Sequence, residues 1–164
     1  MYKIKKYIRS TNFLGFTMME LVLIIAILGI FTIMAMTRTR IGLATIREQI
    51  AIDQITSDID LVRSMAFGKH DTITIVFSTS EESYTVFNGP NNARALITDF
   101  PNSDNGLISL DNAAIREVDL QSVNFNGSSE LQFLPLGDPK TGGSITLNSK
   151  TISIEPVTGK WTIN

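Results

Sequence analysis

The sequence predicts an α+β fold in which a long N-terminal helix packs on a C-terminal antiparallel β-sheet or β-sandwich. Three observations lead to this prediction. Residues 16–36 form an apolar run with a single charge, and in residues 37–68 apolar side chains recur at three- and four-residue steps, as in an amphipathic helix. From residue 69 onwards the period drops to two and short strand-like segments alternate with turns.

Composition narrows the classes of function. The 164 residues allow one modest domain beyond the N-terminal helix, and they contain no cysteine. Disulfides, thiolate nucleophiles and cysteine metal ligands are therefore excluded. The first 15 residues contain Lys3, Lys5, Lys6 and Arg9 and no acidic residue. Without these four cations the 14 basic residues become 10 against 16 acidic ones, a net charge near −6. This balance argues against a general binder of nucleic acids or anionic lipids.

The apolar run 16–36 has the length of a membrane span. As a helix it measures about 31 Å, at about 1.5 Å per residue, and a bilayer has a hydrocarbon core of about 30 Å. Glu20 lies near its start, and residues 21–36 carry no charge. An acidic residue within a membrane segment is energetically costly and suggests a function.

Three interpretations compete for this run. A secretory signal peptide needs a shorter apolar core and a pair of small residues at its end, which Met34-Ala35-Met36 lacks. An ordinary single-pass anchor explains the length but not Glu20. Cleavage after Gly15 explains both, because Phe16 then becomes the N-terminus and Glu20 lies one turn into the helix. A carboxylate there suits the positive end of the helix dipole and could pair with the new amine of a neighbouring subunit.

The segment Gly15-Phe16-Thr17-Met18-Met19-Glu20-Leu21 resembles the processing signature of type IV prepilins and type II secretion pseudopilins. The resemblance implies that a prepilin peptidase cuts between Gly15 and Phe16 and methylates the Phe16 amine. It also implies that Glu20 pairs with the Phe16 amine of a subunit already in the filament. The basic leader would remain in the cytoplasm by the positive-inside rule, and the rest of the chain would face outward.

This interpretation divides the chain into four parts. They are a leader (1–15), a transmembrane and filament helix (16–36), an amphipathic continuation of the helix (37–68) and an extracytoplasmic β-domain (69–164). Gly68 is the predicted C-cap of the helix. The predicted buried stripe of the amphipathic part comprises Ile46, Ile50, Ile52, Ile55, Ile59, Val62 and Ala66. The predicted polar side comprises Arg47, Glu48, Asp53, Gln54, Asp58, Asp60 and Arg63.

The β-domain is predicted to contain several short strands. A slip in the alternation within 117–125 suggests a β-bulge. The predicted strands are 72–77, 84–87, 94–98, 107–110, 117–125, 131–133, 145–147, 152–154 and 160–163.

The closing segments of the chain sharpen the resemblance. Phe133-Leu134-Pro135-Leu136-Gly137 and Val157-Thr158-Gly159-Lys160 are similar to the last strands of the GspH/FimT-type minor pilins. The resemblance implies a non-enzymatic structural subunit of a type II secretion pseudopilus or type IV pilus. Such a subunit is anchored in the inner membrane, has a periplasmic or extracellular C-terminal domain, and binds other pilin subunits. An alternative within the same resemblance is a minor pilin that binds DNA during uptake.

A small basic group carries the DNA alternative. Lys140, Lys150 and Lys160 lie in or beside consecutive turns, and Trp161 follows the last of them. Lysines could contact phosphates and a tryptophan could stack on a base. Three lysines on an acidic chain make a thin patch, so a solvated edge is the favoured interpretation.

An oxygen-rich segment is the candidate metal site. Asp99, Asp104 and Asp111 could supply the ligands that calcium prefers. The spacing of an EF-hand loop fails, because Pro101 and Ser103 fall at ligand positions. Turn formation by Asn and Asp explains the composition better, and no metal or cofactor is predicted.

His70 is the only histidine and could be combined with Ser78 or Ser80 into a hydrolase triad. The chain has no Gly-x-Ser-x-Gly motif, which would place a serine on a nucleophile elbow. The sequence therefore predicts that the protein is not an enzyme.

Overall fold

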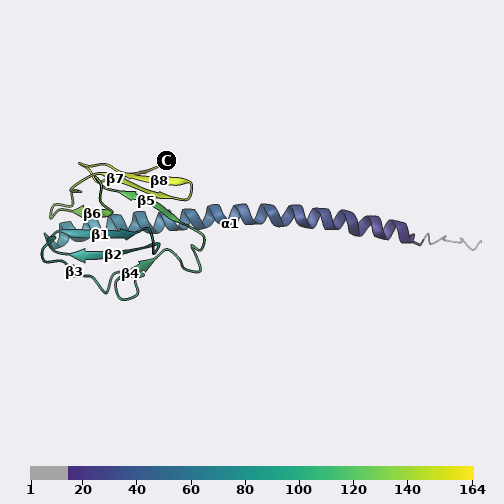
Figure 1. The fold of residues 1–164 in the computed structure, drawn as a ribbon, viewed down its shortest axis with the longest axis horizontal. Coiled ribbons are helices and arrows are strands. Elements are labelled where there is room, and N and C mark those ends of the chain that lie inside the picture. The colour runs from purple at the N-terminus through teal and green to yellow at the C-terminus, as the bar shows by residue number, and fades with distance from the viewer. Residues whose placement is uncertain (1–14) are drawn as a thin grey trace, which may run out of the picture. The chain divides into compact units, whose positions relative to one another are not determined.

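A computed structural model describes residues 15–164, without the side chains of residues 37–41. The predicted leader, including Lys3, Lys5, Lys6 and Arg9, lies outside the described residues apart from Gly15. The described residues fall into two units, of which the first ends at Arg40 and the second is Ile41–Asn164. Helix α1 (Met18–Lys69) contributes to both units (Figure 1).

The first unit contains the predicted membrane segment. Within the described residues, Met18–Met36 is the one helical stretch that is long and apolar enough to cross a membrane. Its side chains are exposed throughout in the part of the chain that the structure describes.

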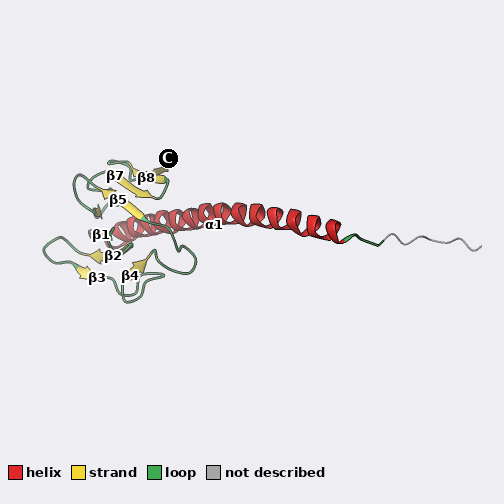
Figure 2. Ribbon diagram, turned by 45° about the vertical axis from the view of Figure 1, so that its right-hand side comes forward, coloured by secondary structure: helices red, strands yellow, loops and turns green. Residues whose placement is uncertain are grey.

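The second unit contains the C-terminal part of α1 and two antiparallel sheets, which confirms the α+β prediction. Sheet A has the order β3-β2-β1-β6, with β4 also paired to β2, and sheet B has the order β5-β7-β8-β9. Figures 1 and 2 show β2, β3 and β4 on one side of this part of the helix and β7 and β8 on the other. The strands are β1 (Ile73–Ser78), β2 (Ser83–Asn88), β3 (Ala95–Leu96), β4 (Leu107–Ser109), β5 (Leu120–Asn124), β6 (Glu130–Phe133), β7 (Gly143–Leu147), β8 (Lys150–Ile154) and β9 (Trp161–Ile163).

Each predicted strand is found, with shifted ends. The predicted bulge is confirmed as a shift of register between Leu120 and Ser122, where β5 pairs with β7. Strand β5 begins at Leu120 rather than at residue 117. Within the core the Phe77 ring lies between Tyr84 and Phe125, with centroid distances of 5.4 and 6.3 Å.

In the C-terminal part of α1, the buried positions differ from the single stripe that the sequence predicts. Ile46 and Ile50 were predicted to be buried, but they are 57% and 42% exposed. Glu48 and Asp58 were predicted to face solvent, but they are only 6% and 5% exposed. Because two sheets lie against the helix, the buried arc is wider than one stripe and includes polar positions. The rest of the predicted stripe, from Ile52 to Ala66, is buried as expected.

The predicted C-cap at Gly68 is wrong. Helix α1 continues to Lys69, and His70 takes the left-handed conformation with a φ of 51°. The His70 N–H donates to the Phe67 carbonyl (3.4 Å), and the Asp71 N–H donates to the Ala66 carbonyl (3.3 Å). These two bonds form a Schellman motif with histidine at the position that glycine usually occupies.

Candidate functional site

The start of α1 is organised by Thr17 and Glu20. The Thr17 hydroxyl accepts a hydrogen bond from the Glu20 N–H (3.2 Å), and the Thr17 carbonyl accepts from the Leu21 N–H (3.1 Å). Thr17 is therefore the N-cap of the helix. Threonine followed three residues later by glutamate is the sequence signature of a capping box. The sequence interpretation missed this role of Thr17, although the spacing was visible.

The three residues of the predicted processing and assembly site are all solvent-exposed. Gly15 and Phe16 precede the helix, and Glu20 lies in its first turn. Among the described residues the Glu20 carboxylate forms no ion pair. A Cβ at Gly15 would meet no atom within 4 Å, and its φ is not positive. Packing against the described residues therefore does not require glycine at this position.

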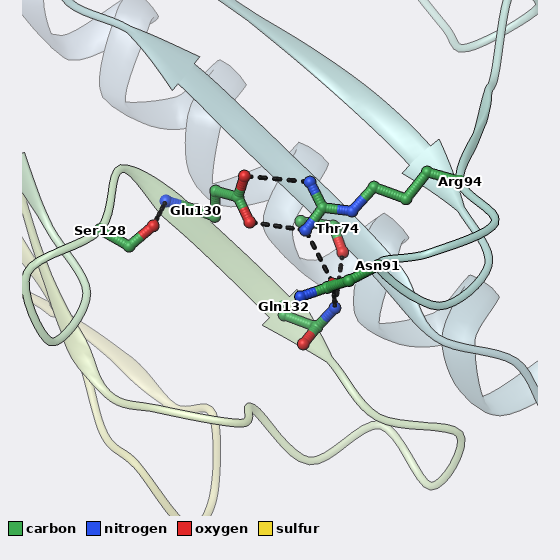
Figure 3. Close-up of polar contacts among 6 residues, drawn as sticks. All are labelled: Thr74, Asn91, Arg94, Ser128, Glu130 and Gln132. Carbon is green, nitrogen blue, oxygen red and sulfur yellow. Dashed lines mark hydrogen bonds and ion pairs between the residues drawn. The ribbon is translucent and has the colours of Figure 1, made fainter.

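A network of polar side chains lies on one face of sheet A (Figure 3). The Arg94 guanidinium donates to both carboxylate oxygens of Glu130, at 3.0 and 2.6 Å. The Asn91 Oδ1 accepts from Arg94 (2.8 Å) and from Gln132 (2.6 Å), and Gln132 also donates to Thr74 (3.1 Å). The network holds the loop between β2 and β3 against β6. Hydrogen bonds from Arg94 lower the pKa of Glu130.

A second group of polar contacts connects sheet B to the helix. The buried Glu48 carboxylate accepts from the Ser149 N–H (2.8 Å) and from the Ser149 hydroxyl (2.9 Å to Oε2). Nearby, Arg47 forms an ion pair with Glu117 at 2.9 Å. These contacts anchor the turn between β7 and β8 and the segment before β5. They explain why a glutamate is buried at this helical position.

A third group of polar contacts connects the helix to sheet A. The Tyr84 hydroxyl donates to the Asp58 Oδ2 at 2.6 Å and accepts from Gln54 Nε2 at 3.3 Å. Burial raises the pKa of Asp58, and the hydrogen bond from Tyr84 opposes that rise. Burial and the neighbouring carboxylate raise the pKa of Tyr84. Each of these three groups of contacts fixes a strand or loop of the β-domain.

Two of the four candidate DNA contacts are directed toward the helix. Lys150 Nζ donates to Gln49 Oε1 at 2.8 Å. Trp161 Nε1 donates to Asp60 Oδ2 at 3.2 Å, and its partly buried ring packs against the core.

The other two candidates are exposed and lie on neighbouring turns. A Cβ at Gly159, next to Lys160, would lie 3.2 Å from Pro139, which precedes Lys140. Lys150 begins β8, whereas the Lys160 carbonyl accepts a hydrogen bond from Glu155, just past the far end of that strand. The three lysines therefore do not share one edge, and DNA binding stays a prediction.

The candidate calcium residues are exposed: Asp99 lies in a turn, Asp104 in an isolated β-bridge with Leu107, and Asp111 in a loop. Asn102 and Asn105 have φ values of 58° and 51°, the conformation that Asn adopts in turns. Across residues 15–164, no group of three or more His, Asp or Glu side chains is placed to hold a metal ion.

The residues of the imagined hydrolase triad are also placed. His70 is exposed at the helix end, with its ring 6.1 Å from that of Phe67. The hydroxyls of Ser78 and Ser80 lie 3.2 Å apart and bond to each other.

Comparison with known proteins decides the family. The sequence matches the family model described as "Type II transport protein GspH" over residues 51–162. The chain belongs to the GspH family. The match spans the C-terminal part of α1 and nearly all of the β-domain, so the expected GspH-type pseudopilin is confirmed.

A solved structure has the same fold as this GspH-family chain. It is the minor pseudopilin EpsH from the type 2 secretion system of Vibrio cholerae, with a TM-score of 0.55 and 9% sequence identity. The alignment covers 71% of this chain and 94% of EpsH. None of the curated proteins matches the sequence. At this identity the likeness concerns the fold alone, and the family rests on the sequence match.

Proposed function

We propose that this GspH-family chain is a minor pseudopilin, a structural subunit of a type II secretion pseudopilus. The observation that carries the proposal is the combination of three features on one chain. A segment with the spacing of a prepilin processing site, from Gly15 to Glu20, precedes an exposed apolar helix, and a GspH-type domain follows it. The family match begins at residue 51, so the processing step rests on the N-terminal residues.

The proposed pathway begins in the inner membrane. The cations Lys3, Lys5, Lys6 and Arg9 keep the N-terminus in the cytoplasm, and residues 16–36 span the bilayer. Prepilin peptidase then cleaves between Gly15 and Phe16 and methylates the new amine.

Assembly then depends on Glu20. Its carboxylate lies in the first helical turn and has no ion-pair partner among the described residues. In a filament, the N-terminal amine of a neighbouring subunit would neutralise it. An unpaired charge in apolar packing costs roughly several kcal/mol. The pairing would therefore favour subunits that pack in the correct register. The role is structural, and no catalytic step is proposed.

The test compares two substitutions in the first helical turn. Glu20→Ala should leave membrane insertion and cleavage intact but remove the subunit from sheared or purified filaments. Met19→Ala is the matched control, because Met19 is also exposed and precedes Glu20 directly. Incorporation of Glu20→Ala at the level of Met19→Ala would contradict the proposed role.

A further inference from the structure

One narrow line of helix α1 stays uncovered by the β-domain. From Arg47 to Phe67 the exposed helical side chains recur at alternating steps of three and four residues, while the others are buried or half-buried. This spacing places them in a single row along the helix. We call this row the outer stripe, and its residues are Ile50, Asp53, Ser57, Asp60, Ser64 and Phe67.

The C-terminal part of the outer stripe forms one wall of a groove. The groove has a volume of about 540 Å³ and is lined by Asp60, Arg63, Ser64, Phe67, Leu136 and Gly137. The loop between β6 and β7 is the other wall. Arg63 Nε donates to the Gly137 carbonyl at 3.2 Å, which fixes this loop beside the helix. Ser64, a small residue, leaves the space between the two walls open.

The walls of the groove expose large apolar side chains. Phe67 is 59% exposed and Leu136 is 71% exposed, although both belong to a well-packed domain. Adjacent exposed apolar side chains beside polar residues are typical of protein interaction sites. An incoming apolar side chain would be covered on both sides by these two residues.

The charges of the outer stripe indicate what else the partner must carry. Asp53 and Asp60 lie seven residues apart, and neither forms an ion pair within the part of the chain that the structure describes. The Asp53 carboxylate accepts a hydrogen bond from Gln49, and the Asp60 carboxylate accepts one from Trp161. The cation nearest to Asp60 in sequence, Arg63, donates through its Nε to the Gly137 carbonyl, and the cation nearest to Asp53, Arg47, is paired with Glu117. A basic side chain is therefore the complement of this row.

We propose that the groove and the outer stripe form a docking surface for a partner subunit of the same filament. The partner segment inserts an apolar side chain between Phe67 and Leu136 and places a lysine or arginine on Asp60. The proposal rests on the proposed function, because it takes the partner from the pseudopilus. It adds a contact that lies in the β-domain unit, apart from Glu20 and the membrane segment.

The experiment uses the full chain in cells that lack the native copy, with secretion as one readout. Ser64→Arg should fill the groove, and Asp60→Lys should repel the partner cation. Ser122→Arg is the matched control, because Ser122 is an exposed serine on β5 outside the groove. A photo-crosslinking amino acid at position 64, and separately at position 122, provides the second readout. Immunoblots give the level of each variant.

The expected result is a fall in secretion of at least about tenfold for Ser64→Arg and for Asp60→Lys, at normal protein levels, with Ser122→Arg unaffected. Position 64 should crosslink to another pseudopilus subunit, at a peptide that contains a basic and an apolar residue. Should Ser64→Arg be degraded, Asp60→Lys and the crosslink decide. Normal secretion by Asp60→Lys, or no subunit adduct at position 64, overturns the docking surface. Failure of the wild-type chain to restore secretion would overturn the proposed function instead.

Discussion

Replacing Tyr84 by phenylalanine isolates the interaction between the helix and sheet A. The change removes one hydroxyl that donates to the buried Asp58 carboxylate at 2.6 Å and keeps the ring. A hydrogen bond to a charged group contributes about 1.5–3 kcal/mol. The free energy of unfolding at pH 7 should therefore fall by about 2 kcal/mol, and Tm by roughly 5–10 °C for a domain of this size.

The loss of stability caused by Tyr84→Phe should depend on pH in a defined direction. Burial raises the pKa of Asp58 above its usual 3.8, and the Tyr84 hydroxyl partly opposes this rise. The stability that this group contributes is fully present below pH 3.8 and is lost as pH rises through the raised pKa. Without the Tyr84 hydroxyl the pKa rises further. Tyr84→Phe should thus cost more at pH 7 than at pH 4.

Urea unfolding of Ile41–Asn164, followed by circular dichroism at both pH values, measures this difference. Asp58→Asn is the control background, because it removes the titrating group. There Tyr84→Phe should cost about 1 kcal/mol or less, independently of pH. An equal cost of Tyr84→Phe at pH 4 and pH 7 in the wild-type background would refute the reasoning.

Two further predictions concern the β-domain. Arg94→Met should lower the free energy of unfolding at pH 7 by about 1 kcal/mol. Because Arg94 lowers the pKa of Glu130, this contribution is present above pH 4.5 and is lost as pH falls. A pH-independent effect in urea unfolding would contradict this prediction. Gly143→Ala should cost about 3 kcal/mol or more, because the new Cβ would lie 2.2 Å from the Asn124 carbonyl oxygen. Gly68→Ala, where a helical Cβ meets nothing within 4 Å, should instead raise stability by about 0.5–1 kcal/mol, and thermal melts that rank the two alike would count against this packing.

Local patterns predicted the elements because each pattern reflects a local cause. Ile73 and Ile75 recur at a step of two because alternate residues of a strand point to the same face. The predicted processing segment from Gly15 to Glu20 is contiguous, so the sequence alone was enough to propose it. Thr17 could have been identified in the same way.

Features that depend on distant contacts could not be predicted. The pairing of β1 with β6 joins Ile73 to Phe133, and no local pattern specifies such a partner. The burial of Glu48 and Asp58 follows from the enclosure of the helix by two sheets. The groove likewise requires the contact of Arg63 with Gly137, which lie 74 residues apart in the sequence.

The mass of the mature N-terminus tests the central claim most directly. The full-length chain is produced in a cell that contains the secretion machinery, and the membrane fraction is digested and analysed by mass spectrometry. The account predicts an N-terminal peptide that begins at Phe16 and carries one methyl group on its amine. A mature chain that still begins at Met1, or one that begins beyond residue 36, would contradict it.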